Sequence, residues 1–391
     1  MMISVKQAKN ILNNHIPTSK EVQVSLLDGL NHTLAKDIYS PINMPPFRQS
    51  AMDGYALSLH DTLFYKLIGE IKAGDENKIE LKPGQAVKIF TGAAVPNSAN
   101  TVIQIEKTTI ANEILQLNES VALNKNIRPI AEQIQANEIA LAKGTLLNAA
   151  SIGFLAGLGI TTVSVYKKPI VGILVTGNEL VKPGHGLAPG KIYESNSIML
   201  QAALLNANFD KINTYEVDDN FINTKKSIAK ALKENDILLI SGGISVGNYD
   251  FVKAALEELQ VEKLFYKVNQ KPGKPLFVGK IQDQLIFALP GNPAASLTCY
   301  YIYVEPILRA IASKSLPETH TIQKQLSHHL KVDNTRSQFL KATFCEDEVA
   351  VLSHQQSSML NTFALANCLI YLPEGNYELQ KGSKVDTYLI R

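Results

Sequence analysis

The sequence lacks a strong net charge, an abundance of cysteine and a long uninterrupted apolar run. Its 38 basic and 36 acidic side chains leave a formal net charge of +2, which argues against a protein that holds nucleic acid by electrostatic attraction. The cysteines are Cys299, Cys345 and Cys368, and they form no CxxC pair. We therefore expect reduced, buried structural thiols in a cytoplasmic protein.

One apolar stretch, Ala149 to Val165, invites comparison with a membrane span. It is shorter than the roughly 20 residues that a spanning helix needs, and three glycines interrupt it. We expect a short helix that ends near Gly159, followed by a strand from Thr161 to Tyr166. The chain turns polar soon after Met1 and shows no signal-peptide pattern, so we expect no membrane contact.

The sequence pattern centres on Asp236 to Asp250, which reads DILLISGGISVGNYD. Its apolar run Ile237 to Ile240 is typical of a strand buried on both faces of a parallel sheet. A Gly/Ser loop follows, and a helix begins near Tyr249. Because the first amides of a helix lack partners, this combination predicts an anion site, although a tight turn without a ligand is the alternative. The loop residues expected at this site are Ser241, Gly242, Gly243, Ser245 and Gly247.

Two further apolar strands end in similar turns. Ile170 to Val175 leads into Thr176 and Gly177, and Gln284 to Leu289 leads into a Pro-Gly-Asn-Pro turn that suits a helix start. In a doubly wound sheet, ligands bind outside the carboxyl ends of the strands. We therefore expect the three turns to line one site, which adds Pro290, Gly291, Asn292 and Pro293.

The chain changes its pattern at two places. Beyond residue 168 strands and helices alternate, which predicts a βαβ series with a parallel core, whereas short strands dominate before this point and after residue 316. The length of 391 residues suggests two to four domains. We expect a central doubly wound α/β domain (1–20 and 168–316), an elongated β-rich domain (21–44 and 134–167), an inserted β-rich domain (45–133) and a C-terminal β-barrel (317–391).

Local signals predict individual elements. Ser4 and Gln7 form a capping box before a helix at Val5 to Asn14, and a short helix is expected within Asp28 to Ala35. The other expected elements are helices at Ser195 to Asn206, Phe221 to Glu234, Tyr249 to Leu259 and Pro293 to Ser313, and strands at Lys211 to Val217 and Val261 to Val268.

Acidic residues gather near the strand ends. Carboxylates beside phosphate-binding loops suit Mg²⁺, which takes oxygen ligands and bridges phosphates. Taken singly, each acid fits a solvated or helix-capping role better than a site: Asp219 could cap the next helix, and Glu194 could pair with a neighbouring lysine. Their shared place at one sheet edge, however, favours a site. These acids are Glu179, Glu194, Asp218, Asp219 and Asp250.

Two other segments carry candidate residues. In KPGKP, Lys271 and Lys274 suit a pyrophosphate or an oxyanion. The loop PPFRQSAMDGYAL carries Asp53, which is either a functional loop residue or, with Gly54, part of a hairpin turn.

Long motifs occur in order along nearly the whole chain: PPFRQSAMDGYAL, KIFTGAAVP, VTGNEL, KIYESN, SGGISVGNYDFVK, KPGKP and ALPGNPAAS. In this order they resemble the MoeA family of molybdopterin molybdenumtransferases and the matching part of gephyrin. The resemblance implies a MoaB/Mog-like α/β domain. It also implies an enzyme of molybdenum cofactor biosynthesis that takes molybdate and adenylylated molybdopterin and releases AMP with the help of magnesium.

The resemblance further implies a homodimer, in which the β-rich domain of one subunit faces the α/β domain of its partner and the active site is shared. Lys271 and Lys274 would attract molybdate and stabilise phosphate charge. The implied catalytic residues are Asp53, Glu179, Asp250 and Lys274, with Asp250 and Glu179 as metal ligands. The implied substrate-binding residues are Thr91, Gly92, Thr176, Gly177, Ser195, Asn196, Asp219, Ser241, Gly242, Gly243, Ser245, Gly247, Lys271, Gly273, Pro290, Gly291, Asn292 and Pro293.

Some positions depart from the family pattern, because Asn178, Asn248 and Gln133 stand where Asp is frequent. A neutral side chain cannot replace a charged metal ligand, so these acids are not essential here if the protein is active. Asp53 and Glu179 are retained, which favours activity. The alternatives are a molybdopterin adenylyltransferase, a gephyrin-like scaffold that binds peptides, and another nucleotide-cleaving enzyme. Contacts with a molybdopterin adenylyltransferase and with molybdoenzyme chaperones are further expectations.

Overall fold

The computed structural model describes residues 2–76, 78–244, 251–315 and 321–390. The chain divides into two compact units. The first consists of Met1–Val22, Asn31–Thr33 and Val165–Arg391, and the second of Gln23–Leu30 and Leu34–Ser164. The finer division into four domains stays a prediction. Within the described residues, no helix combines the length and the apolar character that a membrane crossing demands.

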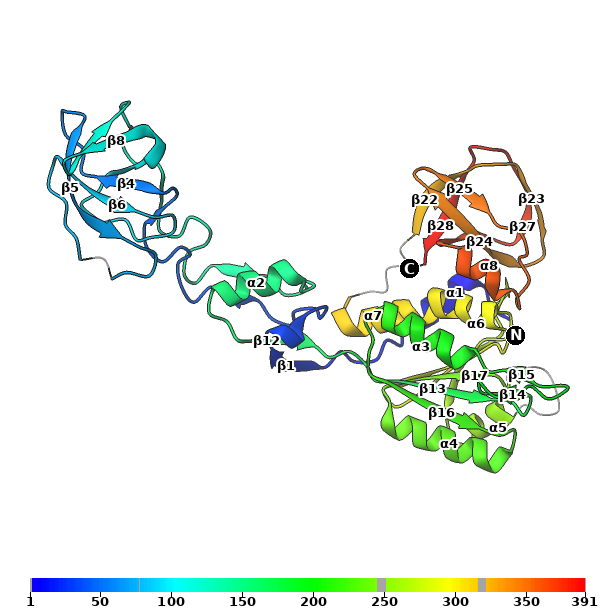
Figure 1. Cartoon of the computed structure of the whole chain (residues 1–391). Coiled ribbons are helices and arrows are strands. Elements are labelled where there is room, and N and C mark those ends of the chain that lie inside the picture. Colours follow the sequence, from blue (N-terminus) through cyan, green and yellow to red (C-terminus); the bar gives the residue numbers. More distant parts are fainter. Residues whose placement is uncertain (1, 77, 245–250, 316–320, 391) are drawn as a thin grey trace. The chain divides into compact units, whose positions relative to one another are not determined.

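A six-stranded sheet forms the centre of the first unit (Figure 1). The strand order is β16-β13-β17-β21-β20-β18, in which the first four strands are parallel and the last two join antiparallel. The strands β13 and β17 are buried along their whole length, as the continuous apolar runs predict. The bounds are β13 Val171–Thr176, β16 Ile212–Val217, β17 Ile237–Ser241, β18 Glu262–Tyr266, β20 Phe277–Ile281 and β21 Gln284–Leu289.

Helices cover both faces of this sheet because alternate strand residues point to opposite sides. Ile173 and Leu239 share one core cluster with α1, α3, α6 and α7. Leu174 and Ile240 belong to a second cluster with α4 and α5 on the other face (Figure 1). The bounds are α1 Val5–Asn13, α3 Asn196–Asn206, α4 Phe221–Glu234, α5 Phe251–Glu258, α6 Pro293–Cys299 and α7 Glu305–Ser313.

The structure confirms several local predictions and corrects others. The Ser4–Gln7 capping box is present, and α4 has its expected bounds. The predicted strand at Val261 to Val268 is β18, but it joins the sheet through the antiparallel strand β20, so the sheet is mixed. The start predicted for α5, at Tyr249 and Asp250, lies outside the described residues.

The expected long helix from Pro293 to Ser313 is interrupted by a π-helical turn at Tyr300–Val304. Pro306 follows this turn and has no backbone N–H, so the carbonyl of Ile302 loses its usual helical donor. A local widening of the helix accommodates this loss. Tyr303, one of its residues, is buried.

The C-terminal part of the first unit is a closed five-stranded barrel. Its strands follow the order β24-β25-β22-β28-β26, and pairing of β26 with β24 closes it. The short strand β19, Gln270–Lys271, pairs with β24 and so ties the KPGKP segment to the barrel. The bounds are β22 Thr321–Leu326, β23 Leu330–Asn334, β24 Ser337–Cys345, β25 Glu348–Val351, α8 Leu360–Leu365, β26 Cys368–Leu372, β27 Gly375–Leu379 and β28 Lys384–Leu389.

The second unit is β-rich, as predicted. Its main sheet has the order β7-β4-β6-β5-β9-β8. The helix expected within Asp28 to Ala35 is only a 3-10 turn at Leu27–Gly29, because Asn31 adopts a φ of 60° that ends the helical path. The bounds are β1 Glu21–Ser25, β2 Ile38–Tyr39, β3 Gln49–Ser50, β4 Gly54–Leu57, β5 Phe64–Ile71, β6 Gln85–Ile89, β7 Thr101–Gln104, β8 Thr108–Ala111, β9 Ile114–Leu117, β10 Ile127–Arg128, β11 Ile139–Leu141, α2 Ala149–Gly157 and β12 Thr162–Tyr166.

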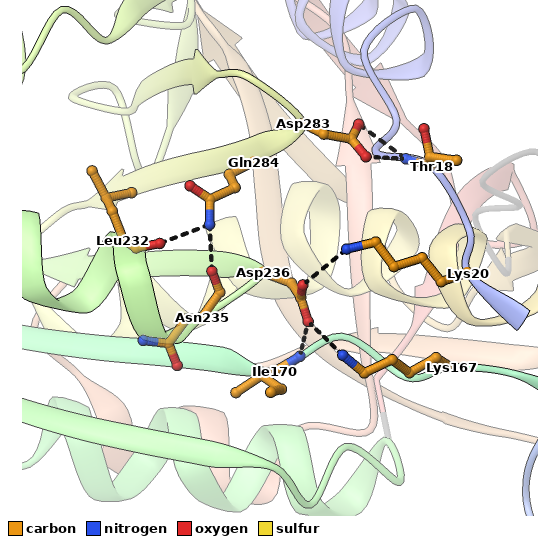
Figure 2. A network of polar contacts seen from close by, with 9 residues as sticks. All are labelled: Thr18, Lys20, Lys167, Ile170, Leu232, Asn235, Asp236, Asp283 and Gln284. Atoms are coloured by element: carbon orange, nitrogen blue, oxygen red, sulfur yellow. Dashed lines mark hydrogen bonds and ion pairs between the residues drawn. The ribbon is translucent and has the colours of Figure 1, made fainter. Parts of the chain in front are cut away.

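A polar network lies at the amino ends of the central strands (Figure 2). Asp236 accepts the backbone N–H of Ile170 at 2.9 Å and lies 3.8 Å from Lys20 and 3.7 Å from Lys167. Gln284 donates to the carbonyls of Leu232 and Asn235, at the end of α4. The network therefore holds the segments that enter β13 and β17, at the edge opposite the predicted site.

We expect Asp236→Ala to lower the free energy of unfolding by about 1–3 kcal/mol, because a partly buried N–H and two ammonium groups lose a charged partner. Glu258→Ala is the control: its carboxylate is 52% exposed and contacts Lys225, so we expect a loss of at most about 1 kcal/mol. Urea unfolding measures both. Equal losses in the two variants would refute a special role for Asp236.

Candidate functional site

A cavity of about 490 Å³ lies at the carboxyl ends of β13, β17 and β21. The three predicted turns meet at this cavity. The fold therefore brings residues from distant parts of the chain together at the carboxyl ends of the strands, as predicted. The predicted site residues that line it are Thr176, Gly177, Glu179, Ser195, Asn196, Asp219, Ser241, Gly242, Gly243, Pro290, Gly291, Asn292 and Pro293.

Hydrogen bonds fix the acidic side of this cavity. Thr176 donates its hydroxyl to Asp219 at 2.5 Å, and the backbone N–H of Asn178 donates to the same carboxylate at 3.1 Å. The Asn178 side chain in turn accepts the N–H of Asp219 at 3.1 Å. Asn220, and not Asp219, caps α4. The carboxylate of Asp219 is therefore held at the cavity by Thr176 of β13 and by Asn178. The alternative that Asp219 caps α4 was wrong.

Asn196 joins two of the three turns, those that follow β17 and β21. Its amide nitrogen donates to the Ser241 hydroxyl and to the carbonyl of Gly291, each at 2.8 Å. Its Oδ1 atom is buried and has no hydrogen-bond partner among the described residues. A ligand donor or a water in the cavity would satisfy this acceptor.

Glu194 has a structural task in the same wall. It accepts the backbone N–H of Ser197 at 2.8 Å and the Ser197 hydroxyl at 2.5 Å, which satisfies a free amide in the first turn of α3. The sequence alternative that paired Glu194 with a lysine was wrong.

The described lining of the cavity is acidic. It contains Glu179, Glu194 and Asp219 and no lysine or arginine. An anionic ligand would be repelled by these carboxylates unless a cation lay between them. Within the described residues no three His, Cys, Asp or Glu side chains form a ready metal site. The predicted ligand Asp250, with Ser245, Gly247 and Asn248, lies outside the described residues.

The KPGKP segment touches the cavity through Pro275, whereas Lys271, Gly273 and Lys274 do not line it. Both lysine side chains are exposed. These lysines can therefore contact a ligand of this cavity only if the ligand extends beyond the cavity.

A second cavity of about 560 Å³ adjoins the first. The two cavities share Val175, Gly177, Leu180 and Glu194. The second contains Asp218 and Lys226 and includes Lys182, which forms a 3.0 Å ion pair with Glu216. Sequence analysis named Asp218 but did not foresee a second chamber.

Asp53 and Thr91 meet in the second unit. The Asp53 carboxylate accepts the backbone N–H of Thr91 at 2.7 Å and its hydroxyl at 2.8 Å. These two bonds lower the pKa of Asp53. Gly92 follows with a φ of 83° and is partly buried.

Asp53 and Gly54 do not form a hairpin turn, because β3 and β4 pair with other strands and not with each other. Gly54 is needed for another reason: a Cβ there would lie 1.8 Å from the backbone oxygen of Ile103 on the neighbouring strand β7. The glycine is thus explained by close packing against β7, and the aspartate by the hydrogen bonds that its carboxylate accepts from Thr91.

The cysteines match their prediction only in part. Cys299 and Cys368 are buried, and burial raises the pKa of both thiols, that of Cys368 to about 12. Such thiols stay protonated and are poor nucleophiles. Cys345 is exposed, contrary to the expectation, because it ends β24 at the barrel rim.

Comparison with known proteins identifies the family. Residues 3–159 match the MoeA N-terminal region (domain I and II), residues 172–310 a probable molybdopterin binding domain, and residues 323–390 the MoeA C-terminal region (domain IV). A molybdopterin molybdenumtransferase from Haemophilus influenzae is 32% identical, with 98% of each chain covered. The chain belongs to the MoeA family.

Other MoeA relatives support this assignment. A molybdopterin molybdenumtransferase from Bacillus subtilis is 32% identical over 94% of this chain and 89% of its own. The molybdopterin biosynthesis moeA protein from Pyrococcus horikosii has the same fold, with a TM-score of 0.84, 29% identity and full coverage of both chains. The chain is thus a transferase of molybdenum cofactor biosynthesis, and the matches to the N- and C-terminal MoeA regions disfavour the adenylyltransferase alternative.

Sequence reasoning missed part of this MoeA cavity. Leu180, Ile192 and Tyr193 line it from two short parallel strands, β14 Leu180–Val181 and β15 Ile192–Tyr193. The only available signal was their place inside the VTGNEL and KIYESN motifs. Runs of two residues carry no periodicity that could have revealed strands.

We expect Thr91→Val to raise the pKa of Asp53, because the variant loses the hydroxyl donor but keeps the backbone N–H. The pKa should stay below the ordinary value. The two hydrogen bonds from Thr91 stabilise the folded protein only while Asp53 is ionised. Because they lower the folded-state pKa, their contribution is present above the ordinary carboxyl pKa and disappears as pH falls through the folded-state pKa. Carboxyl ¹³C NMR titration measures the shift, with Thr91→Ser as the control. An unchanged pKa of Asp53 in Thr91→Val would contradict the role of the Thr91 hydroxyl in lowering it.

Proposed function

We propose that the chain inserts molybdate into adenylylated molybdopterin and releases AMP, with the strand-end cavity as the main substrate site. The observation that carries the proposal is the convergence of the three turns after β13, β17 and β21 on one cavity. The adjoining cavity supports it, because the substrate has two bulky parts joined by a pyrophosphate and the two chambers meet at Gly177. The turns would hold the molybdopterin part, and the second chamber offers space for the nucleotide part.

The chain supplies polar groups that suit such a substrate. Asn196 holds two of the three turns together and leaves its Oδ1 free to accept a donor of the pterin. Ser241 and the glycines after it expose the backbone to a phosphate. Asp219, fixed by Thr176 and Asn178, would orient a cation or a donor group near the pyrophosphate.

The donor set fits Mg²⁺, which we propose as the cofactor. Mg²⁺ commonly binds one or two carboxylates together with waters and substrate phosphates, so a prebuilt cage of three side chains is not required. Glu179 and Asp219 are the described carboxylates that could hold it, with Asp250 as the further predicted ligand. When bound, the cation would neutralise phosphate charge beside an acidic wall.

Lys271 and Lys274 would attract molybdate at the rim. Neither ammonium has an acidic ion-pair partner among the described residues, so both charges are available to an oxyanion. Two lysines close in sequence and attached to one short loop give a local positive charge beside the acidic cavity.

We expect Lys274→Ala to raise the molybdate concentration for half-maximal AMP release roughly tenfold to a hundredfold, as the loss of one charge-assisted contact predicts. Its dependence on Mg²⁺ should not change. Lys263→Ala, an exposed lysine on β18, is the control. Separate titrations of molybdate and Mg²⁺ measure both dependences. If molybdate dependence is unchanged, this loop does not receive the oxyanion.

We further propose a cytoplasmic homodimer in which Asp53 and Thr91 of one subunit complete the site of the other. The exposed face of α3 supports an interface, because Ile198 and Leu205 lie two helical turns apart and are 54% and 56% exposed. Contacts with a molybdopterin adenylyltransferase and with molybdoenzyme chaperones remain part of the proposal.

We expect Leu205→Glu to shift the protein from dimer to monomer and to lower turnover, since a buried charge would oppose association. Ile222→Glu is the matched control: Ile222 is 60% exposed but lies on α4, on the opposite face of the sheet. Sedimentation velocity measures the state of each variant. A wild-type protein that is an active monomer would refute the dimer, and a dimeric Leu205→Glu variant would exclude this face.

A scaffold role is the second candidate, and one feature favours it. A cavity of about 310 Å³ lies between α1, α7 and the barrel, where Ile307, Tyr371 and Tyr388 provide apolar and aromatic walls. Aromatic walls of this kind suit a peptide side chain. Comparing peptide pulldown with AMP release distinguishes the scaffold from the transferase.

A further inference from the structure

We propose that Gln270, held by Tyr303, is a positioning residue that sets the affinity of the KPGKP loop for its oxyanion. The proposal rests on the proposed function, in which Lys271 and Lys274 attract molybdate. It adds that a buried polar pair, outside the substrate cavity, fixes the path of the loop that carries both lysines.

The Gln270 side chain bonds to the loop from within. Gln270 is fully buried, and its amide nitrogen donates to the carbonyl of Pro272 at 3.0 Å. The same nitrogen lies 3.7 Å from the sulfur of Cys299. Pro272 is the second residue of KPGKP, so this hydrogen bond restrains the loop between its two lysines.

Tyr303 holds the other end of this amide. Its hydroxyl donates to Oε1 of Gln270. Tyr303 is 1% exposed, and burial raises the pKa of its hydroxyl well above the ordinary value. The hydroxyl therefore stays protonated and can act as the donor, which determines which way the Gln270 amide faces.

The loop has little room to move away from this pair. A Cβ at Gly273 would lie 2.5 Å from the Cys299 sulfur and 2.8 Å from the Gln270 amide nitrogen. The backbone N–H of Val268 donates to the carbonyl of Lys274 at 3.0 Å, while Lys271 pairs with Gln338 of the barrel. Both lysines thus project from a segment that is held at each end and in its middle.

Tyr303 lies within the π-helical turn at Tyr300–Val304. Tyr300 lies in the same turn and is equally buried, but its hydroxyl has no hydrogen-bond partner among the described residues. The two tyrosines therefore form a natural matched pair.

A packing role alone makes a different prediction from a positioning role. Loss of the Tyr303 hydroxyl leaves Oε1 of Gln270 as a buried acceptor without a donor, which destabilises the protein in either case. Only the positioning role also weakens oxyanion binding, because the freed amide no longer holds Pro272. Replacing both partners by apolar groups should restore the stability that is lost through the unpaired Oε1, yet Pro272 would still lack its donor.

The test uses the full chain with Tyr303→Phe, the control Tyr300→Phe, the double variant Gln270→Met/Tyr303→Phe, and Lys274→Ala. Calorimetric titration with molybdate alone and the molybdate dependence of AMP release are measured beside thermal unfolding. We expect Tyr303→Phe to weaken molybdate binding about threefold to tenfold, as the loss of one hydrogen bond predicts, with little change in maximal turnover. Tyr300→Phe should match the wild type.

The double variant separates the two roles. We expect it to unfold at a higher temperature than Tyr303→Phe and still to bind molybdate weakly. Wild-type molybdate binding in this variant would overturn the proposal, as would a Tyr303→Phe variant with unchanged molybdate affinity while Lys274→Ala is impaired. If Lys274→Ala also binds molybdate normally, the oxyanion does not lie at KPGKP, and that part of the proposed function fails together with this inference.

Discussion

The parallel register of β13, β17 and β21 is the constraint on which the site depends. Val175 is level with Ser241, and Ser241 is level with Leu289. The three strands therefore end together, and the turns that follow them open onto one edge. The register is secured from within, because each strand contributes alternate apolar side chains to the two core clusters that lie on opposite faces of the sheet. The packing of the core thus fixes the register of the strands, and the register in turn places the polar turns.

The sequence predicts most of this arrangement because its signals are local and strong. Continuous apolar runs reveal buried strands, and Ser4 and Gln7 reveal a helix start within four residues. The antiparallel strand β20 escaped prediction because its turn to β21, at Gln282 and Asp283, contains neither glycine nor proline. The hairpin alternative for Asp53 and Gly54 was wrong because Asp-Gly favours a turn locally, whereas this glycine is required by the distant backbone of Ile103.

In the candidate site, too, some features follow from the sequence and others do not. Residues that directly follow apolar strands, such as Thr176 and Ser241, were predictable because the end of a strand fixes their place. The hydrogen bonds of Asp219 to Thr176 and of Asp53 to Thr91 join residues about 40 positions apart, and no periodicity encodes such pairs. The place of Lys274 outside the cavity depends on a loop whose path is set by the buried side chain of Gln270.

The division of the chain has a consequence for its synthesis on the ribosome. The buried face of α1, with Val5, Ala8 and Leu12, packs in a core that includes Ile302 and Ile307. The second unit is encoded between these partners and is about 140 residues long. At 5–20 residues per second, α1 therefore waits on the order of ten seconds while the second unit emerges, and longer still for its helical partners. An apolar helix face left uncovered for that time is a natural target for chaperones during translation.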